Sequence, residues 1–402
     1  MDKGGLQGGF GPLSGPPKPD DNPLKASRPL SSTAVVSPSY PFGKGDSQRS
    51  GLFQAKDLTA VVHWSSMTEQ FFFAVTEATQ VAEVRRHVVA LAGKLGFSET
   101  EVGKVAIVAT EAATNLAKHA LQGEVVVRLI EDQDRRGIEI LALDNGPGMV
   151  NVAQSLRDGF STAGSPGTGM GAMSRLARSF DLHSDPKGTA VFAEVWPGRA
   201  SESKSPDAMD IGAVCRAKRN EVACGDGWGA ASFTGRVLLL LVDGLGHGLG
   251  AATAAQEAIR IFRSTLQHSP ARIVESAHAA LRSTRGAVLG IAEIDLSQKL
   301  VRYAGVGNIS GVIVSDGGSR HLMSTNGIVG QDVRKVQEFS YPFPTDAVLV
   351  LHSDGLTSHW NLSNYPGLLR KVPGLIAGIL YRDYQRGSDD VTVVAARASV
   401  RQ

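Results

Sequence analysis

The chain has 402 residues, which is enough for two domains that each bury a core of their own. Hydrophobic residues make up 42% and charged residues 20%, as in a typical globular protein. The 41 basic and 39 acidic residues nearly cancel, so a strongly basic nucleic-acid-binding face is not expected. The longest apolar runs, 237–242 and 347–351, are much shorter than the ~20 residues of a membrane helix, and they predict buried strands.

The start of the chain lacks the charged and then apolar pattern of a secretory signal. Two cysteines, Cys215 and Cys224, can form one disulfide, but such sparse use of cysteine is typical of a reducing compartment. We therefore expect a cytoplasmic protein that does not enter a membrane.

Residues 1–55 are rich in Gly, Pro and Ser, and we expect a disordered tail there; a start codon assigned too far upstream is the alternative. Ordered structure is expected from about Leu58. Ser98 and Glu101 form the capping-box pattern of a helix start. The patterns predict strands at 70–76, 124–130, 137–144 and 189–196, and helices at 78–95, at 98–120 and from 171.

The polar segment 197–208 contains Pro and Gly, and we expect it to link a first domain, 56–196, to a second, 209–398. In the second domain, strands and helices alternate. The predicted strands are 237–242, 288–295, 301–305, 347–351 and 391–395, and the predicted helices are 249–265 and 272–281.

The predicted helix at 98–120 carries a polar face. Glu111 and Asn115 lie four residues apart, and Lys118 and His119 complete the face. An amide oxygen can bind Mg²⁺, and a carboxylate can polarise a water or a hydroxyl, so this face suits a metal–nucleotide complex. Taken alone, the pattern is better explained as a solvent-exposed helix face.

Two glycine-rich loops favour a nucleotide site over a simple solvent-exposed helix face. Asp144 ends a predicted strand, and Gly146 and Gly148 follow it; the carboxylate can accept a hydrogen bond from an exocyclic amine while the glycines let the backbone approach a planar base. The loop at 164–171 opens a helix, where backbone amides can cradle phosphate. The order of the three motifs favours a nucleotide site.

Over residues 58–196 the chain resembles the GHKL ATPase family, and within it the anti-sigma-factor kinases of the RsbW, RsbT and SpoIIAB kind. Residues 111–115 match the N box, 144–148 the adenine-binding box and 167–171 the lid glycines. The resemblance implies Glu111 as the general base. The implied positions for ATP and its Mg²⁺ are Asn115, Asp144, Gly146, Gly148, Gly167, Gly169, Gly171 and Thr189.

Four Asp-containing turns lie beyond the linker, at 224–228, 242–248, 352–355 and 388–392. Three of them adjoin apolar strand-like runs, whose ends can gather carboxylate oxygens around Mg²⁺ or Mn²⁺. A single Asp-Gly pair is better explained by ordinary turn chemistry. Their recurrence in one domain favours a metal site.

Over residues 209–398 these turns resemble the PPM phosphatase superfamily in its SpoIIE and RsbX branch. The implied metal ligands are Asp226, Asp243, Gly244, Asp354 and Asp389. Asp243 would bridge two ions that activate a water for attack on phosphorus, with no phospho-enzyme. Asp389, rather than Asp390, is the ligand if the turn matches the family's Asp-Asn-x-Thr pattern.

Other prominent side chains favour structural roles. His247 and His352 lack the spacing of zinc ligands, and Trp228 either shapes the mouth of the metal site or packs in the core. The turn that ends at Asn308 resembles a core strand and turn of SpoIIE-type domains, for which packing is the simplest role.

Together the resemblances imply an α+β protein, with a Bergerat-type ATP-binding α/β sandwich followed by a PPM-type β-sandwich flanked by helices. We expect a partner-switching regulator that uses ATP, Mg²⁺ and Mn²⁺, phosphorylates or binds a STAS-domain anti-sigma antagonist and removes such a phosphate. In the alternative, the ATPase domain is only a nucleotide-dependent binding module. A histidine-kinase relic is disfavoured, and a homodimer stays open.

Overall fold

The computed structural model describes residues 1, 63–66, 70–120, 122–132, 135–149, 151–155, 169–198 and 209–399. The expected tail at 1–55 lies outside the described residues apart from Met1, and so does the expected linker apart from 197 and 198. The described residues from His63 onward belong to one compact unit.

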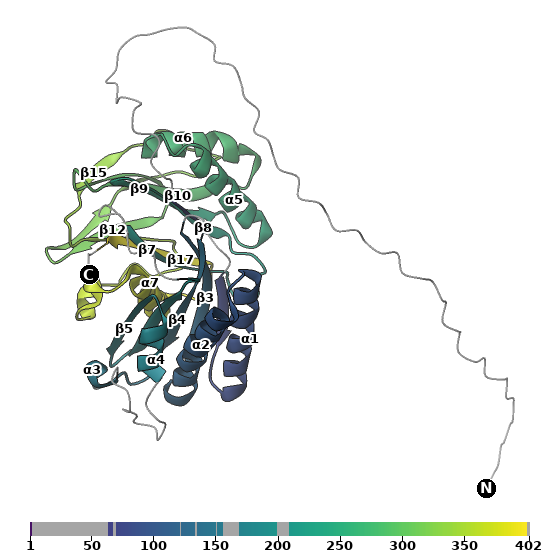
Figure 1. Cartoon of the computed structure of the whole chain (residues 1–402). Coiled ribbons are helices and arrows are strands. Elements are labelled where there is room, and N and C mark those ends of the chain that lie inside the picture. The colour runs from purple at the N-terminus through teal and green to yellow at the C-terminus, as the bar shows by residue number, and fades with distance from the viewer. Residues whose placement is uncertain are drawn as a thin grey trace. The chain divides into compact units, whose positions relative to one another are not determined.

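The first domain is a five-stranded antiparallel sheet with helices on one face (Figure 1). In sheet order its strands are β2 (Gln70–Ala74), β3 (Gly123–Asp132), β4 (Arg135–Asp144), β6 (Gly188–Val195) and β5 (Ser179–Asp185). The helices are α1 (Ala78–Lys94), α2 (Glu99–His119), the short α3 (Val152–Ser155) and α4 (Gly169–Leu176). The packed helices and sheet confirm the expected α/β sandwich.

The capping box predicted at the start of α2 is present. The hydroxyl of Ser98 accepts from the Glu101 amide, and the Glu101 carboxylate accepts from the Ser98 amide at 2.8 Å. One side of α2, which includes Val105, Val108 and Ala112, is buried against the sheet. The cap fixes where the helix begins and the core fixes which side is buried, and this register places Glu111 against Gly169 at the start of α4.

The second domain is a β-sandwich. One sheet contains β1 (His63–Ser66), β8 (Asp226–Phe233), β9 (Arg236–Gly244), β10 (Ala287–Asp295), β11 (Leu300–Val306), β14 (Ser324–Thr325) and β15 (Phe339–Pro342). The other contains β13 (Gly318–Leu322), β12 (Ser310–Ser315), β16 (Val348–His352), β17 (Val391–Ala398) and β7 (Met209–Arg216). Leu241, Tyr303 and Leu351 belong to a buried cluster shared by both sheets, and α5 (Leu249–Ser264) and α6 (Pro270–Ala280) cover the outer face of the first (Figure 1).

The strand β1 lies in the second domain. It pairs antiparallel with β8, with His63 opposite Ser232, whereas the expected boundaries assigned residues 56–196 to the first domain. Its backbone partners lie more than 160 positions further along the chain, and nothing in the local pattern of residues indicates them.

The helix α7 (Pro373–Tyr384) lies between the sheet of the first domain and the β7–β17 side of the second (Figure 1). Its residues from Pro373 to Tyr381 are all buried. A helix that is apolar on every side has no amphipathic period, which explains why the sequence did not predict it. Glycine permits the close approach, because a Cβ on Gly378 would lie 2.6 Å from a methyl of Leu141.

Polar contacts surround this shared core. The side chain of Gln70 on β2 bonds to the backbone of Ala213 and Cys215 on β7, at 3.0 Å each. Further along the interface, Arg216 lies 2.5 Å from the Glu124 carboxylate. Such contacts join strands of both domains. The two domains are therefore held together by contacts between several strands as well as by the chain connection.

No helix among the described residues has both the length and the apolar character needed to cross a membrane.

The close packing of α7 predicts a large difference between two glycine substitutions. A Cβ on Gly212 would lie 2.1 Å from the backbone nitrogen of Gly374, whereas a Cβ on Gly103 in α2 would meet nothing within 4 Å. We expect Gly212→Ala to destabilise the protein by about 1–3 kcal/mol or more through overpacking. Gly103→Ala should leave stability unchanged or raise it by roughly 0.5–1 kcal/mol. Urea unfolding of both variants measures this, and equal stabilities would contradict the packing of α7.

Candidate nucleotide and metal sites

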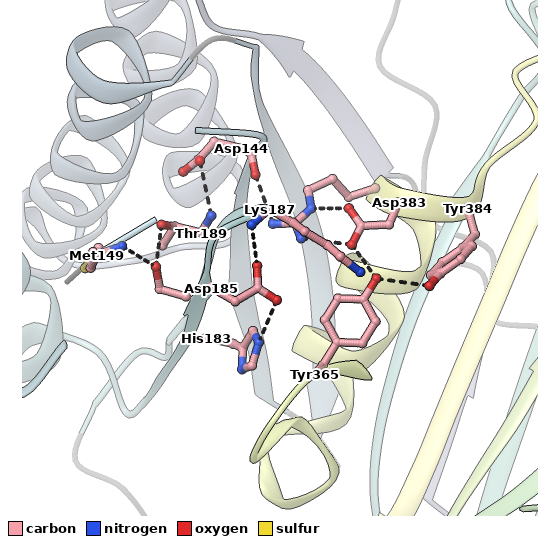
Figure 2. A network of polar contacts seen from close by, with 11 residues as sticks. Asp144, Met149, His183, Asp185, Lys187, Thr189, Tyr365, Asp383 and Tyr384 are labelled. Carbon is pink, nitrogen blue, oxygen red and sulfur yellow. Dashed lines mark hydrogen bonds and ion pairs between the residues drawn. The ribbon is translucent and has the colours of Figure 1, made fainter. Parts of the chain in front are cut away.

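The end of β4 holds the centre of the candidate nucleotide site. Oδ1 of Asp144 accepts hydrogen bonds from the backbone amides of Gly146 at 2.7 Å and Thr189 at 3.1 Å. The Thr189 hydroxyl lies 3.0 Å from that of Ser184, which also accepts from the Met149 amide (Figure 2). These bonds fix the direction of the Asp144 carboxylate before any ligand binds.

The two glycines after Asp144 are required by close backbone contacts. A Cβ on Gly146 would lie 2.9 Å from the carbonyl oxygen of His119 at the end of α2. Gly148 has φ = +74°, and a Cβ there would lie 2.1 Å from the carbonyl oxygen of Asp185. The two glycines therefore let the loop pack directly against the neighbouring backbone.

The polar face of α2 meets the start of α4. A Cβ on Gly169 would lie 2.4 Å from Oε2 of Glu111, so the carboxylate lies against the first residue of this helix. Nδ2 of Asn115 is buried and has no hydrogen-bond partner among the described residues. A buried polar group without a partner is costly, so a ligand or water at this amide is expected. Gly171 is buried in α4, and Gly167 lies outside the described residues.

The metal motifs meet at the ends of β8, β9 and β16. Asp226 and Asp243 are directly opposite each other on β8 and β9. Asp226 is 1% exposed, and its Oδ2 accepts from the Ser353 hydroxyl at 2.6 Å. The same hydroxyl oxygen accepts from the Thr392 amide at 2.9 Å, so one serine links Asp226 to the turns that carry the other two motifs.

The remaining two aspartates of the set lie beside this pair. Oδ2 of Asp354 accepts from the side-chain amide of Asn308 at 2.9 Å. Asp390 is buried, and its two oxygens accept from the Lys218 and Gly225 amides at 2.7 and 2.9 Å. Its neighbour Asp389 is exposed. Asp390 thus holds two loops, whereas Oδ1 of Asp389 accepts from the Asp390 amide at 2.9 Å.

The electrostatics of the cluster favour a cation. Burial, followed by the charges of Asp226, Asp354 and the two aspartates at 389 and 390, raises the pKa of Asp243 to about 8. Burial also raises the pKa of Asp226 to about 7, in spite of the hydrogen bond from Ser353. Carboxylates that repel one another in a buried place are stabilised by a shared divalent ion.

Within the described ranges, no three His, Cys, Asp or Glu side chains converge closely enough to hold a metal as they stand. A Cβ on Gly244, the residue after Asp243, would lie 2.2 Å from the Ala251 carbonyl oxygen, so glycine is required there. The donors present are all oxygen and suit Mg²⁺ or Mn²⁺.

Sequence reasoning missed three polar partners of these sites. Asn308 bonds to Asp354 although we expected it only to pack, and Ser353 orients Asp226. The sequence could have indicated Asn308 and Ser353, because each lies beside a glycine or an aspartate in a motif. Arg382 bonds to the backbone of Asp144, and no motif marked it.

The side chains given structural roles behave as such. Trp228 is 1% exposed and packs in the sandwich core, so it does not line the site. His352 is buried and accepts from the Trp360 indole at 3.1 Å, whereas His247 is exposed and pairs with Glu221. Cys215 and Cys224 have sulfur atoms 3.6 Å apart, and they do not form the disulfide.

The two halves of the chain are similar to different known proteins. The family model of the histidine kinase-like ATPase domain matches residues 74–194, and that of Stage II sporulation protein E (SpoIIE) matches residues 234–399. The serine/threonine-protein kinase RsbT of Bacillus subtilis (strain 168) is 32% identical over 107 residues, which are 26% of this chain and 80% of RsbT. The phosphoserine phosphatase RsbX of the same strain is 23% identical over 140 residues, which are 35% of this chain and 70% of RsbX.

Among solved structures, a chain of the bacterial stressosome is 32% identical, with a TM-score of 0.44, over 47% of this chain and 100% of that chain. The two family models and the two Bacillus subtilis relatives match the chain by sequence. They confirm the resemblances inferred from the motifs. The chain belongs to the RsbT-type family of histidine-kinase-like ATPases, and its ATPase domain is joined to a SpoIIE-type PPM domain of the metal-dependent serine/threonine phosphatases.

Proposed function

We propose that the chain is a bifunctional partner-switching regulator. Its SpoIIE-type domain removes phosphate from serine or threonine of a partner protein with Mg²⁺ or Mn²⁺, and its RsbT-type domain binds ATP and phosphorylates a protein. A STAS-domain anti-sigma antagonist in the cytoplasm is the partner that we propose for both. The observation that carries the proposal is the meeting of four separate aspartate motifs, from both sheets of the sandwich, around Asp243.

In the phosphatase domain, we assign Asp243 and the carbonyl oxygen of Gly244 to a divalent-cation site. Asp354 and Asp389 would bind cation there as well, and Asp226 would support the site. Such cations, when bound, supply an activated water and neutralise charge on the phosphoryl group. The residues of the chain orient these ligands, because Asn308 directs Asp354, Ser353 directs Asp226 and Asp390 fixes two loops.

In the ATPase domain, we assign Asp144 and Thr189 to adenine, with Gly146 and Gly148 beneath the ring. Asn115 holds Mg²⁺, and Glu111 takes the proton from the attacking hydroxyl. The glycines at 167, 169 and 171 cover the phosphates. The buried amide nitrogen of Asn115, which lacks a partner among the described residues, supports this assignment.

A second candidate function is a nucleotide-dependent binding module that acts on the phosphatase. The contact of Arg382 with Asp144 favours it, because a residue of the phosphatase domain touches the candidate adenine site. In that case ATP binds but no phosphate is transferred to a partner.

Phosphate transfer distinguishes these candidates. We expect Asp243→Asn to abolish Mn²⁺-dependent release of phosphate from a phosphopeptide, because the Asp243 carboxylate is lost. With γ-labelled ATP and STAS-domain proteins, label should build up on one partner only in the Asp243→Asn protein, and Asn115→Ala in addition should remove it. Unchanged phosphate release by the Asp243→Asn protein would contradict the assignment of Asp243 as a metal ligand. Nucleotide binding without labelled partner would leave the binding module as the function of the first domain.

The serine that links the metal motifs gives a further prediction. We expect Ser353→Ala to weaken Mn²⁺ binding by about 10–100-fold, since Asp226 and the Thr392 amide lose the hydroxyl that orients them. Calorimetric titration of Mn²⁺ without substrate measures this. Ser358→Ala is the matched control because Ser358 is exposed and its hydroxyl contacts only the neighbouring His359 in the described part of the chain. Equal Mn²⁺ affinities for both variants would refute the role of Ser353.

A further inference from the structure

The last turn of α7 carries an arginine that extends from the phosphatase domain to the candidate nucleotide site. Nη1 of Arg382 donates to the backbone oxygen of Asp144 at 2.9 Å. Its Nε and Nη2 donate to the two carboxylate oxygens of Asp383 at 2.7 and 3.0 Å, and the arginine side chain is only 5% exposed. The Tyr365 hydroxyl donates to the same carboxylate at 2.6 Å (Figure 2). The phosphatase domain thus fixes the direction of this guanidinium.

Asp144, which accepts this hydrogen bond, is the residue proposed to bind adenine. While its backbone oxygen accepts from Arg382, the Asp144 carboxylate accepts from Gly146 and Thr189. Gly188 leaves the room for this contact: a Cβ there would lie 1.9 Å from the Asp144 oxygen and 2.8 Å from Nη1 of Arg382. A shift of Arg382 would therefore displace the backbone that carries the adenine-binding carboxylate.

The end of this same last turn of α7 and the residues that follow it are bonded to the metal loops. The Thr357 amide donates to the Tyr384 carbonyl at 3.0 Å, and the Arg386 amide donates to the Gly355 carbonyl at 2.9 Å. Gly355 directly follows Asp354, and Asp389 lies three residues after Arg386. One short segment thus connects Asp144 with two of the proposed metal ligands.

We propose that Arg382 is a positioning residue of the nucleotide site and that it couples adenine-nucleotide binding in the first domain to metal binding in the second. The inference rests on the proposed function, since it uses both sites. It adds that each site changes the affinity of the other by the same factor, because coupling between two binding equilibria is reciprocal.

A double-mutant cycle on the full chain tests the coupling through binding alone. The probe is a fluorescent methylanthraniloyl derivative of ADP, titrated at fixed Mg²⁺ and Mn²⁺ and followed by anisotropy. Asp243→Asn disables the metal site, and Arg382→Met keeps the length of the arginine stem but removes its donors. We expect Asp243→Asn to change the Kd of the probe by about fivefold or more in the wild-type background. In the Arg382→Met background the change should be about twofold or less, as for independent sites.

Three results would overturn the inference. One is no effect of Asp243→Asn on the Kd in the wild-type background, and another is the same effect in both backgrounds. The third is a wild-type protein that does not bind the probe, which also removes the proposed nucleotide site. In the first two cases the wild-type protein still binds the probe, so the proposed function survives while the coupling fails.

Two further variants keep the test decisive. Arg397→Met is the matched control, because Arg397 also donates to backbone carbonyls, those of Leu369 and Lys371, but within the phosphatase domain. It should retain the full effect of Asp243→Asn. Arg382→Lys keeps a single donor group. We expect its coupling to be weaker than that of the wild type and stronger than that of Arg382→Met. If Arg382→Met does not fold, the lysine variant replaces it, and coupling equal to that of wild type would then overturn the proposal.

Discussion

The burial of α7 between two sheets is the constraint on which the rest of the molecule depends. The buried cluster around it joins Leu141 and Phe192 of the ATPase sheet to Val350 and Val393 of the phosphatase sheet. Each fully buried Leu or Ile of the helix contributes roughly 1.5–3 kcal/mol. A hydrogen bond at the edge of the interface contributes about 0.5–1.5 kcal/mol net. Apolar burial therefore holds the domains together, while the polar contacts fix their register.

This arrangement has consequences for both sites. The strand that ends at Asp144 lies under α7, and the chain leaves α7 directly into the turn that carries Asp389. Neither site can move its supporting backbone without disturbing the shared helix. In the proposed function, joining two opposed activities in one chain would also raise their effective concentration on a common partner. The shared helix is thus a physical link between the two candidate sites.

Much of this was predictable from local pattern. The capping box at Ser98, the period of α2 and the apolar runs of β9 and β16 gave elements that agree with the structure to within a few residues. The aspartate and glycine motifs identified both families, because their chemistry fixes residue types at short spacing. The preference for Asp389 over Asp390 stays a prediction, which the hydrogen bonds of Asp390 support.

The features that were missed depend on distant partners. The pairing of β1 with β8, the burial of α7 on all sides and the reach of Arg382 to Asp144 each join segments that are far apart in the chain. A single sequence contains no local period for such contacts. Asn308 and Ser353 lie beside recognised motifs, but their hydrogen bonds follow from the folding of separate turns onto one another.

Scanning calorimetry of the full chain, with and without Mg²⁺-ADP, tests the shared core most directly. If α7 joins the two domains as described, they unfold in one cooperative transition, and the nucleotide raises the midpoint of that whole transition. Two separate transitions, with the nucleotide raising only one of them, would contradict the account.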